Sequence, residues 1–308
     1  MKTDYYPEGI LFETEENRAY ISQLSGLMEA CRTKTVIEQK PVMSTSAHEL
    51  VFSFGSITAV MEKSECEYAP PGQRVKDIAV ISRVNKPTCF IVTDIALGGG
   101  EPKIRISRRE AQRTFLEYAR KTFRAGDVLP ARVTHLEPFG AFVDVGCGVV
   151  SMIPTQSISV SRIPHPGDRF ERGQSILVAL KSLDTKSGRF FITHKELLGT
   201  WEQNAAGFSA GQTVMGIIRS VEGYGVFVEL RPNLVGLCEY HGDASVNQLA
   251  AVYIKSIIPE KMKIKLSIVE LFEKKAAPAG LDYYVFDHID YWRYTPEGYT
   301  KKIIEQRF

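Results

Sequence analysis

The sequence is poor in the features that mark secreted, membrane-spanning or disulfide-bonded proteins. Its five cysteines are an odd, widely spaced set without a CxxC pair, so we expect reduced thiols. No apolar run approaches the roughly 18 residues that a membrane helix needs, and the acidic start MKTDYYPEGILFETEEN lacks an apolar segment of signal-peptide length. We therefore expect a cytoplasmic protein without a membrane partner.

Motifs of catalysis and cofactor binding are also missing. The six histidines show no HExxH or HxH spacing, and the glycine-rich stretch 96–103 (ALGGGEPK) lacks the GK[ST] of a phosphate-binding loop. No GxSxG motif occurs. The sequence therefore predicts no enzyme, no metal and no cofactor.

Neither sign of charge predominates, because the net charge is only +2 in a chain that is 24% charged and 44% hydrophobic. A nucleic-acid partner would have to be held by local basic clusters and by stacking, not by an overall field. With 308 residues the chain is long enough for two or three folded modules.

One stretch of sequence occurs twice. Residues 136–145 read LEPFGAFVDV, and residues 221–230 read VEGYGVFVEL. The two agree in residue type at nearly every position, which is typical of repeated modules.

Around each copy, alternating apolar residues predict five short strands. In the first copy they lie within 126–194, with turns at 138–140 and 186–188. A second copy covers 211–268, and a looser one, without the FGxF pattern, covers 25–107. We predict a mainly β protein of three tandem five-stranded OB-fold barrels, the first degenerate, joined by short α-helical linkers.

The last strand of each copy ends in Ser or Thr with Glu three residues on, a possible capping box that would open a helix. The pairs are Ser107 with Glu110, Thr193 with Glu196 and Ser267 with Glu270. The predicted organisation is an N-terminal arm 1–24, linker helices 108–125 and 195–210 between the barrels, and a helix with an aromatic-rich tail over 269–308. The tail either lies over the third barrel or forms an RNA-contacting arm.

Alternation along the repeated strand puts Phe142 and Asp144 on one face, and Phe227 and Glu229 on the equivalent face. We take the acids to mark the wet side, so that each Phe is exposed beside them. Gly140 and Gly225 would permit a bulge that brings the preceding aromatic onto that face. Such a pair is a platform for unpaired bases; the alternative is that the linker helices cover these rings.

These motifs, FGAFVDVG and YGVFVEL with GD or GQ thirteen residues before the first aromatic, resemble the S1 RNA-binding domain. The whole chain resembles clostridial-type multi-domain relatives of the ribosomal protein S1 family. The resemblance implies that RNA is contacted by Phe139, Phe142, Asp184, Arg189, Tyr224, Phe227 and Lys263. Lys261, in the basic cluster 260–265 (EKMKIK) of the last hairpin, is a further candidate.

Departures from the family pattern occur in all three modules. Pro154 and Glu239 stand where the family usually has His in the middle strand, and Val51 stands at the position of Phe142. We therefore expect the first barrel to be structural or protein-binding. The basic stretches 107–124 and 260–265 either contact phosphates or are simply solvated.

Two functions remain. The first is a non-catalytic protein that binds single-stranded RNA, such as mRNA, by aromatic stacking and is linked to translation or the small ribosomal subunit. The second is a docking adaptor whose barrels bind a ribosomal or RNA-decay partner.

Overall fold

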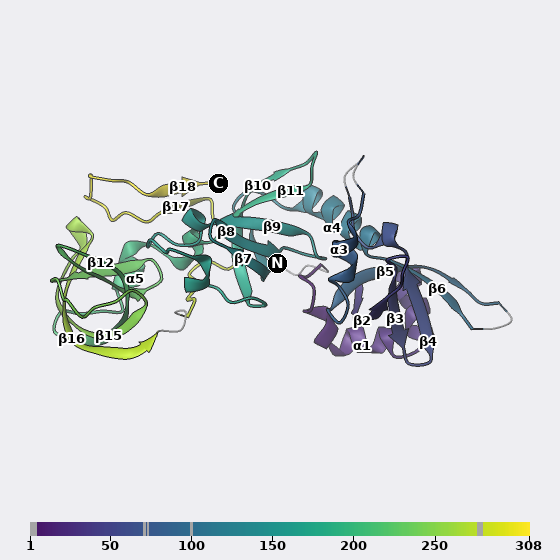
Figure 1. Ribbon diagram of the computed structural model, residues 1–308. Helices are drawn as coiled ribbons and strands as arrows, with labels where there is room; N and C mark the ends of the chain where they lie inside the picture. Colours follow the sequence, from purple (N-terminus) through teal and green to yellow (C-terminus); the bar gives the residue numbers. More distant parts are fainter. Residues whose placement is uncertain (1–4, 70–71, 73, 99–100, 276–279) are drawn as a thin grey trace.

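The computed structural model shows three β-barrels in a row, coloured purple to blue, teal and green along the chain in Figure 1. It describes residues 5–69, 72, 74–98, 101–275 and 280–308. The first four residues of the predicted arm, two glycines of the 96–103 stretch and residues 276–279 of the tail lie outside these. Among the described residues, no helix is both long and apolar enough to cross a membrane.

The first barrel follows three short helices that occupy most of the predicted arm and the start of the first module. These are η1 (Leu11–Glu13), α1 (Glu15–Ile21) and α2 (Leu24–Thr33). The strands are β1 (Ile37–Gln39), β2 (Pro41–Ser44), β3 (Leu50–Phe54), β4 (Ile57–Met61), β5 (Thr88–Ala96) and β6 (Lys103–Ser107), with η2 (Lys63–Glu65) and α3 (Asp77–Ile81) between β4 and β5. β1 and β2, separated by one residue, pair with β5 and β3 and together act as one bent first strand.

The second barrel has strands β7 (Val128–Glu137), β8 (Gly140–Asp144), β9 (Val150–Pro154), β10 (Ser175–Asp184) and β11 (Arg189–Thr193), with η3 (Thr155–Ser157) and η4 (Pro166–Asp168) after β9. The third has β12 (Thr213–Glu222), β13 (Gly225–Arg231), β14 (Leu234–Cys238), β15 (Gln248–Ile258) and β16 (Lys263–Lys275), with η6 (Pro259–Lys261) before β16.

All three sheets have the same strand order. Numbering the strands one to five within each module, with β1 and β2 together as strand one, the order around the first and third sheets is 1-2-3-5-4, and the third closes on itself. The second sheet has the same cyclic order but is open between strands three and five, so that its paired neighbours run 5-4-1-2-3. The prediction of tandem OB-type barrels in a mainly β protein is confirmed. Each barrel encloses its own cluster of buried apolar side chains.

The first linker is the helix α4 (Arg108–Thr122), which begins where the Ser107 hydroxyl accepts a hydrogen bond from Glu110 N at 2.9 Å. Its apolar stripe, Ala111, Phe115, Leu116 and Ala119, is buried in the core of the second barrel. The Phe115 ring stacks on Phe190 at 5.8 Å. The helix is therefore a packed connector.

Two helix predictions are wrong. Residues 195–210 do not form one helix: η5 (Lys195–Leu198) ends at Gly199, whose φ is +81°, and α5 (Trp201–Ala205) begins after a capping box of Thr200 with Gln203. Directly after Ser267 the chain continues as strand β16 to Lys275, paired with β15, and the described residues beyond it, 280–308, form no helix.

Charged residues join the first two barrels through the N-terminal segment. The Glu8 carboxylate, side chain 6% exposed, accepts a hydrogen bond from Arg108 Nε at 2.7 Å and also pairs with Arg83. Its backbone N–H donates to Asp144 Oδ2 at 2.7 Å. Gly9 and Phe12 donate to the buried Glu38 carboxylate at 2.9 and 2.8 Å.

These carboxyl groups differ in protonation. Burial opposes ionisation of Glu8, but the two arginines outweigh it and lower its pKa to about 2. Burial raises the pKa of Glu38 to about 8, and burial together with the Glu8 charge raises the pKa of Asp144 to about 7. Glu38 and Asp144 therefore hold protons at a pH where the unfolded chain has lost them.

Raising the pH should consequently destabilise the contacts of Glu38 and Asp144 with the N-terminal segment. A carboxyl whose pKa is higher in the folded state contributes stability that is complete below its unfolded pKa of about 4 and is lost as pH rises through the folded value. We expect the melting temperature of the wild type to fall between about pH 5 and pH 9 by several degrees, since each pKa unit corresponds to about 1.4 kcal/mol. Calorimetry of Glu38→Gln, which keeps an acceptor oxygen, should show a flatter profile; an equal fall in both proteins would contradict this assignment.

Candidate nucleic-acid interface

The second and third barrels carry the same pair of aromatic side chains. Phe139 and Phe142 have ring centroids 6.0 Å apart at 89°, and Tyr224 and Phe227 have centroids 6.0 Å apart at 88°. The first ring of each pair lies in the turn between strands one and two and is exposed, 59% for Phe139 and 71% for Tyr224. The second lies in strand two and is half-buried. The structure thus brings these four predicted residues into two matching pairs, and the exposure of the first rings shows that the linker helices leave them uncovered.

A glycine makes each pair possible. A Cβ on Gly140 would lie 2.6 Å from the carbonyl oxygen of Ile153, and one on Gly225 would lie 2.5 Å from that of Cys238. Strand three therefore approaches strand two too closely for any side chain at this position. The expected bulge lies instead in strand one, at the register shifts between Val133 and His135 and between Ile218 and Ser220.

The expectation that Asp144 and Glu229 mark a solvent-exposed side of the strand is wrong. Asp144 and Glu229 share a strand face with the half-exposed phenylalanines, yet they are only 3% and 2% exposed. Asp144 accepts hydrogen bonds from the backbone of Glu8, Gly146 and Gly148. One end of the strand face is therefore wet, and the other end is covered by the neighbouring part of the chain.

Strand register extends the second-barrel surface beyond the predicted residues. Phe142 pairs with His135 on β7 and with Met152 on β9, and the rings of His135 and Phe142 are 6.3 Å apart. Phe191 on β11 is 45% exposed. By register it is equivalent to Lys265 of the third barrel, which pairs with Leu237 on strand three of that barrel. We call His135, Phe142, Met152 and Phe191 the second-barrel row.

The predicted basic and acidic residues lie at one end of this row. The Arg189 guanidinium lies over the Phe191 ring at 5.5 Å, and the Arg189 backbone is opposite Asp184 in the strand register of the β10–β11 hairpin. The Asp184 carboxylate accepts from Ser187 Oγ at 2.6 Å and from Lys186 N at 3.0 Å, and these hydrogen bonds lower its pKa. Asp184 thus shapes the turn that presents Arg189. The motif misses Phe191 and His135, although alternation in RFFIT already puts Phe191 on the face of Arg189.

The third-barrel row is Ser220, Phe227, Leu237 and Lys265, from the same register. Beside it lies a groove of about 600 Å³ whose lining includes Tyr224, Phe227, Leu237, Lys255, Lys261, Lys263, Lys265 and Glu239. Lys263 has the same register position as Arg189. The Glu239 carboxylate is held by Lys255 at 2.9 Å, so the groove is basic overall.

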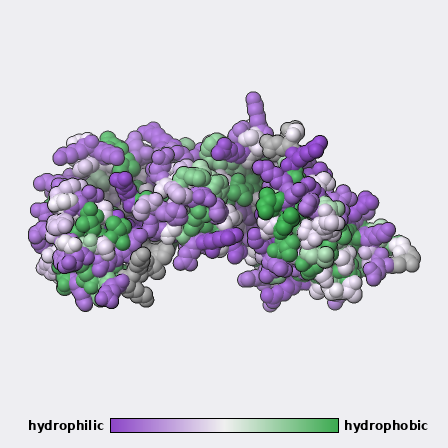
Figure 2. Space-filling view, viewed as in Figure 1, coloured by the Kyte–Doolittle hydropathy of each residue, from purple (hydrophilic) through white to green (hydrophobic). Residues whose placement is uncertain are grey.

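In the first barrel, register places Val51 where the other barrels have phenylalanine. Its row is Met43, Val51, Val60 and Arg105, aliphatic except at the end. Figure 2 shows separate apolar areas on the barrels, divided by polar surface. The first barrel offers no ring for stacking in this row.

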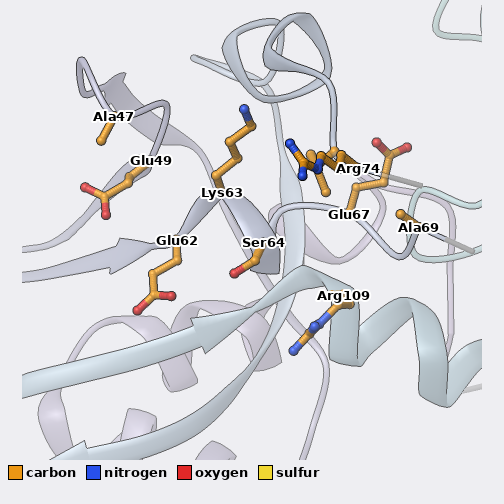
Figure 3. A pocket seen from close by; sticks show the side chains of 10 residues that line it. Ala47, Glu49, Glu62, Lys63, Ser64, Glu67, Ala69, Arg74 and Arg109 are labelled. Atoms are coloured by element: carbon orange, nitrogen blue, oxygen red, sulfur yellow. The ribbon is translucent and has the colours of Figure 1, made fainter. Parts of the chain in front are cut away.

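Two other surfaces with basic side chains, on helix α4 and in a cavity of the first barrel, are less suited to binding an anion. On α4, Arg108 is buried against Glu8, Arg109 pairs with Glu65, and Arg113 pairs with Glu110 and Glu117. A cavity of about 620 Å³ in the first barrel, drawn in Figure 3, mixes Lys63, Arg74 and Arg109 with Glu49, Glu62 and Glu67. Acidic side chains therefore pair with three of the arginines of α4 and offset the positive charge around the cavity, in contrast to the groove of the third barrel. Among the described residues no group of His, Cys, Asp and Glu side chains could hold a metal ion.

Part of the chain, which includes the second barrel, matches a known protein family. The family model for the S1 RNA binding domain matches residues 122–195. The chain is 30% identical over 185 residues, 58% of its length and 47% of the relative, to the small ribosomal subunit protein bS1 homolog of Bacillus cereus. It is 35% identical over 113 residues, 36% of its length and 26% of the relative, to bS1 of Leuconostoc lactis.

The chain therefore spans less than half the length of these relatives. A solved multidomain protein with nucleic acid binding domains from Streptococcus pneumoniae covers 77% of this chain and 74% of its own, at 12% identity and a TM-score of 0.25, a likeness too low to support any argument.

Proposed function

We propose that the chain is a non-catalytic protein that binds single-stranded RNA by stacking bases on its second and third barrels. The match of residues 122–195 to the S1 RNA binding domain and the similarity to the bS1 proteins support this proposal. The observation that carries the proposal is the repetition of one geometry. Two barrels present an exposed and a half-exposed ring, perpendicular and 6.0 Å apart, at the same place in the fold. A structural core has no need to repeat exposed rings.

The surroundings of each pair support RNA over other ligands. Arg189 and Phe191 extend the second-barrel row, and Lys261, Lys263 and Lys265 flank the third. Stacking platforms beside positive charge are the usual means of holding unpaired nucleotides. The proposed site residues are Phe139, Phe142, Arg189, Tyr224, Phe227, Lys261 and Lys263, with Asp184 acting through the turn that it shapes. Because the relatives are named small ribosomal subunit proteins, we further propose that this chain acts in the cytoplasm on mRNA at the small ribosomal subunit.

The test is a comparison of single and double strands. An unstructured 12-nucleotide RNA should bind more tightly than a hairpin stem of equal length, because rings stack on splayed bases but cannot reach bases inside an A-form helix. Fluorescence anisotropy at fixed salt measures both affinities. Equal affinities would exclude stacking as the mode of binding.

One observation favours the adaptor function for the first barrel. Its row is aliphatic, with Met43 and Val60 52% and 41% exposed. Cosedimentation of the chain with small ribosomal subunits stripped of mRNA would support this second candidate. Loss of cosedimentation after Val60→Asp, with RNA affinity retained, would assign it to that barrel.

A further inference from the structure

The C-terminal tail is a strap along the second and third barrels. The backbone N–H of Val128 donates to Asp287 O at 2.9 Å, and that of Ile289 donates to Gly126 O at 2.9 Å. His288 Nδ1 lies 2.7 Å from Asp127 Oδ1. In Figure 1 the yellow tail runs from beside the teal barrel over the green one.

A hairpin of β17 (Tyr291–Arg293) and β18 (Glu305–Arg307) is anchored between these barrels by two buried aromatics. Trp292 Nε1 donates to Gly199 O at 3.2 Å, and the carbonyl of Tyr294 accepts from Trp201 N at 3.1 Å. The Tyr294 hydroxyl donates to Asn233 O in the β13–β14 turn. These anchors fix where the hairpin leaves the barrel surface.

Beyond the anchors, the chain forms a closed turn. Thr295 Oγ1 accepts from Ile304 N at 2.8 Å and donates to Lys302 O at 3.2 Å, which holds the two ends of 296–302 together. Tyr299 lies in this turn and lines the groove of the third barrel. Lys301 and Lys302, both exposed, lie in the same turn.

The hairpin also lines a second cavity of about 720 Å³ through Tyr294 and Ile304. This cavity and the groove share Tyr224, Phe227, Val235 and Met262. The aromatic pair therefore lies where the two parts of the cleft meet. Arg162, Glu222 and the ion-paired Arg219 line one part, and Lys255, Lys261, Lys263 and Lys265 line the other.

We propose that the tail turn is the second wall of an RNA cleft on the third barrel, in which Tyr299 helps to enclose a base that stacks on Tyr224 and Phe227. The inference rests on the proposed function and deepens it. A cleft with aromatic side chains at its centre, the exposed Arg162 toward one end and four lysines toward the other matches a single strand of nucleic acid, which carries bases in its middle and phosphates along its length. The tail thus makes the third barrel a clamp, where an isolated barrel would offer an open face.

The experiment measures the affinity of the full chain for a 12-nucleotide oligouridine by anisotropy. Tyr299→Ala should weaken binding about tenfold, within the range of one lost base–aromatic contact. Phe286→Ala is the matched control, because Phe286 is an aromatic of the same tail, 64% exposed, that lines neither the groove nor the cavity. Its affinity should equal that of the wild type.

A double-mutant cycle separates the clamp from a general effect. In the Phe227→Ala background, Tyr299→Ala should weaken binding less than it does alone, because both rings act on the same base. If the wild type binds RNA and Tyr299→Ala binds equally well, the clamp is wrong and the platforms remain. If the wild type itself does not bind, the proposed function fails and the clamp with it.

Discussion

Replacement of Glu229 by alanine should lower the free energy of unfolding by about 3 to 5 kcal/mol, the cost of breaking a buried ion pair from one side. The Glu229 side chain is 1% exposed and joins the second barrel to the third. Its carboxylate accepts from Arg169 Nη1 of the second barrel at 2.8 Å, and from Arg219 Nε and Nη2 at 3.1 Å each. Alanine would leave two guanidinium groups, 0% and 5% exposed, without their main counter-charge.

Urea denaturation followed by fluorescence of Trp201 and Trp292, which both pack in the third-barrel core cluster, would measure this loss. Glu239→Ala is the control, because that glutamate also forms an ion pair but its side chain is 88% exposed. The control should leave the transition unchanged, since exposed pairs contribute little. A Glu229→Ala protein as stable as the control would show that the joint does not hold the barrels together.

The buried contacts of Asp144 and Glu229 also show what the sequence alone cannot predict. Alternation correctly places Asp144 and Glu229 on the faces of Phe142 and Phe227, but it cannot tell what covers a face. Asp144 is covered by Glu8, 136 residues earlier, and Glu229 by Arg169, 60 residues earlier. Contacts at such separation leave no local pattern, so alternation alone assigns these acids to solvent.

Local signals that compete explain the helix errors. Ser267 and Glu270 have the spacing of a capping box, but β15 is long enough to pair with β16 as far as Lys275. Ile268 and Leu271 pack against the core of the third barrel from that strand. Pairing and burial outweigh a cap worth about 1 kcal/mol. After Thr193 the chain holds a better cap seven residues on, at Thr200, and Gly199 divides the segment.

The repeated motif, by contrast, is sufficient to predict the second and third barrels and their aromatic pairs, because strand period and turn glycines are local features of the sequence. Register then adds what the motif omits. Phe191 and His135 join Phe142 through pairing with other strands, and Tyr299 arrives from a tail 72 residues beyond Phe227. Only the folded chain brings these residues to the aromatic pairs of the second and third barrels.

Phe142→Ala should weaken the binding of single-stranded RNA by about 1 to 3 kcal/mol, the usual contribution of one base stacked on an aromatic ring. Phe227→Ala should have the same effect on the third barrel. Because both rings are half-buried at the barrel surface, each variant should lose less than the roughly 3 kcal/mol of stability that truncation of a core phenylalanine costs.

Val51→Ala provides the matched control, since Val51 has the same register position in a barrel whose row is aliphatic. It removes apolar atoms from an equivalent strand without removing a ring, so RNA affinity should be unaltered. Anisotropy titrations and thermal unfolding of all three variants measure the two effects separately. A Phe142→Ala protein that melts far below the wild type, yet binds RNA equally well while folded, would show that this ring serves packing and that the bases are held elsewhere.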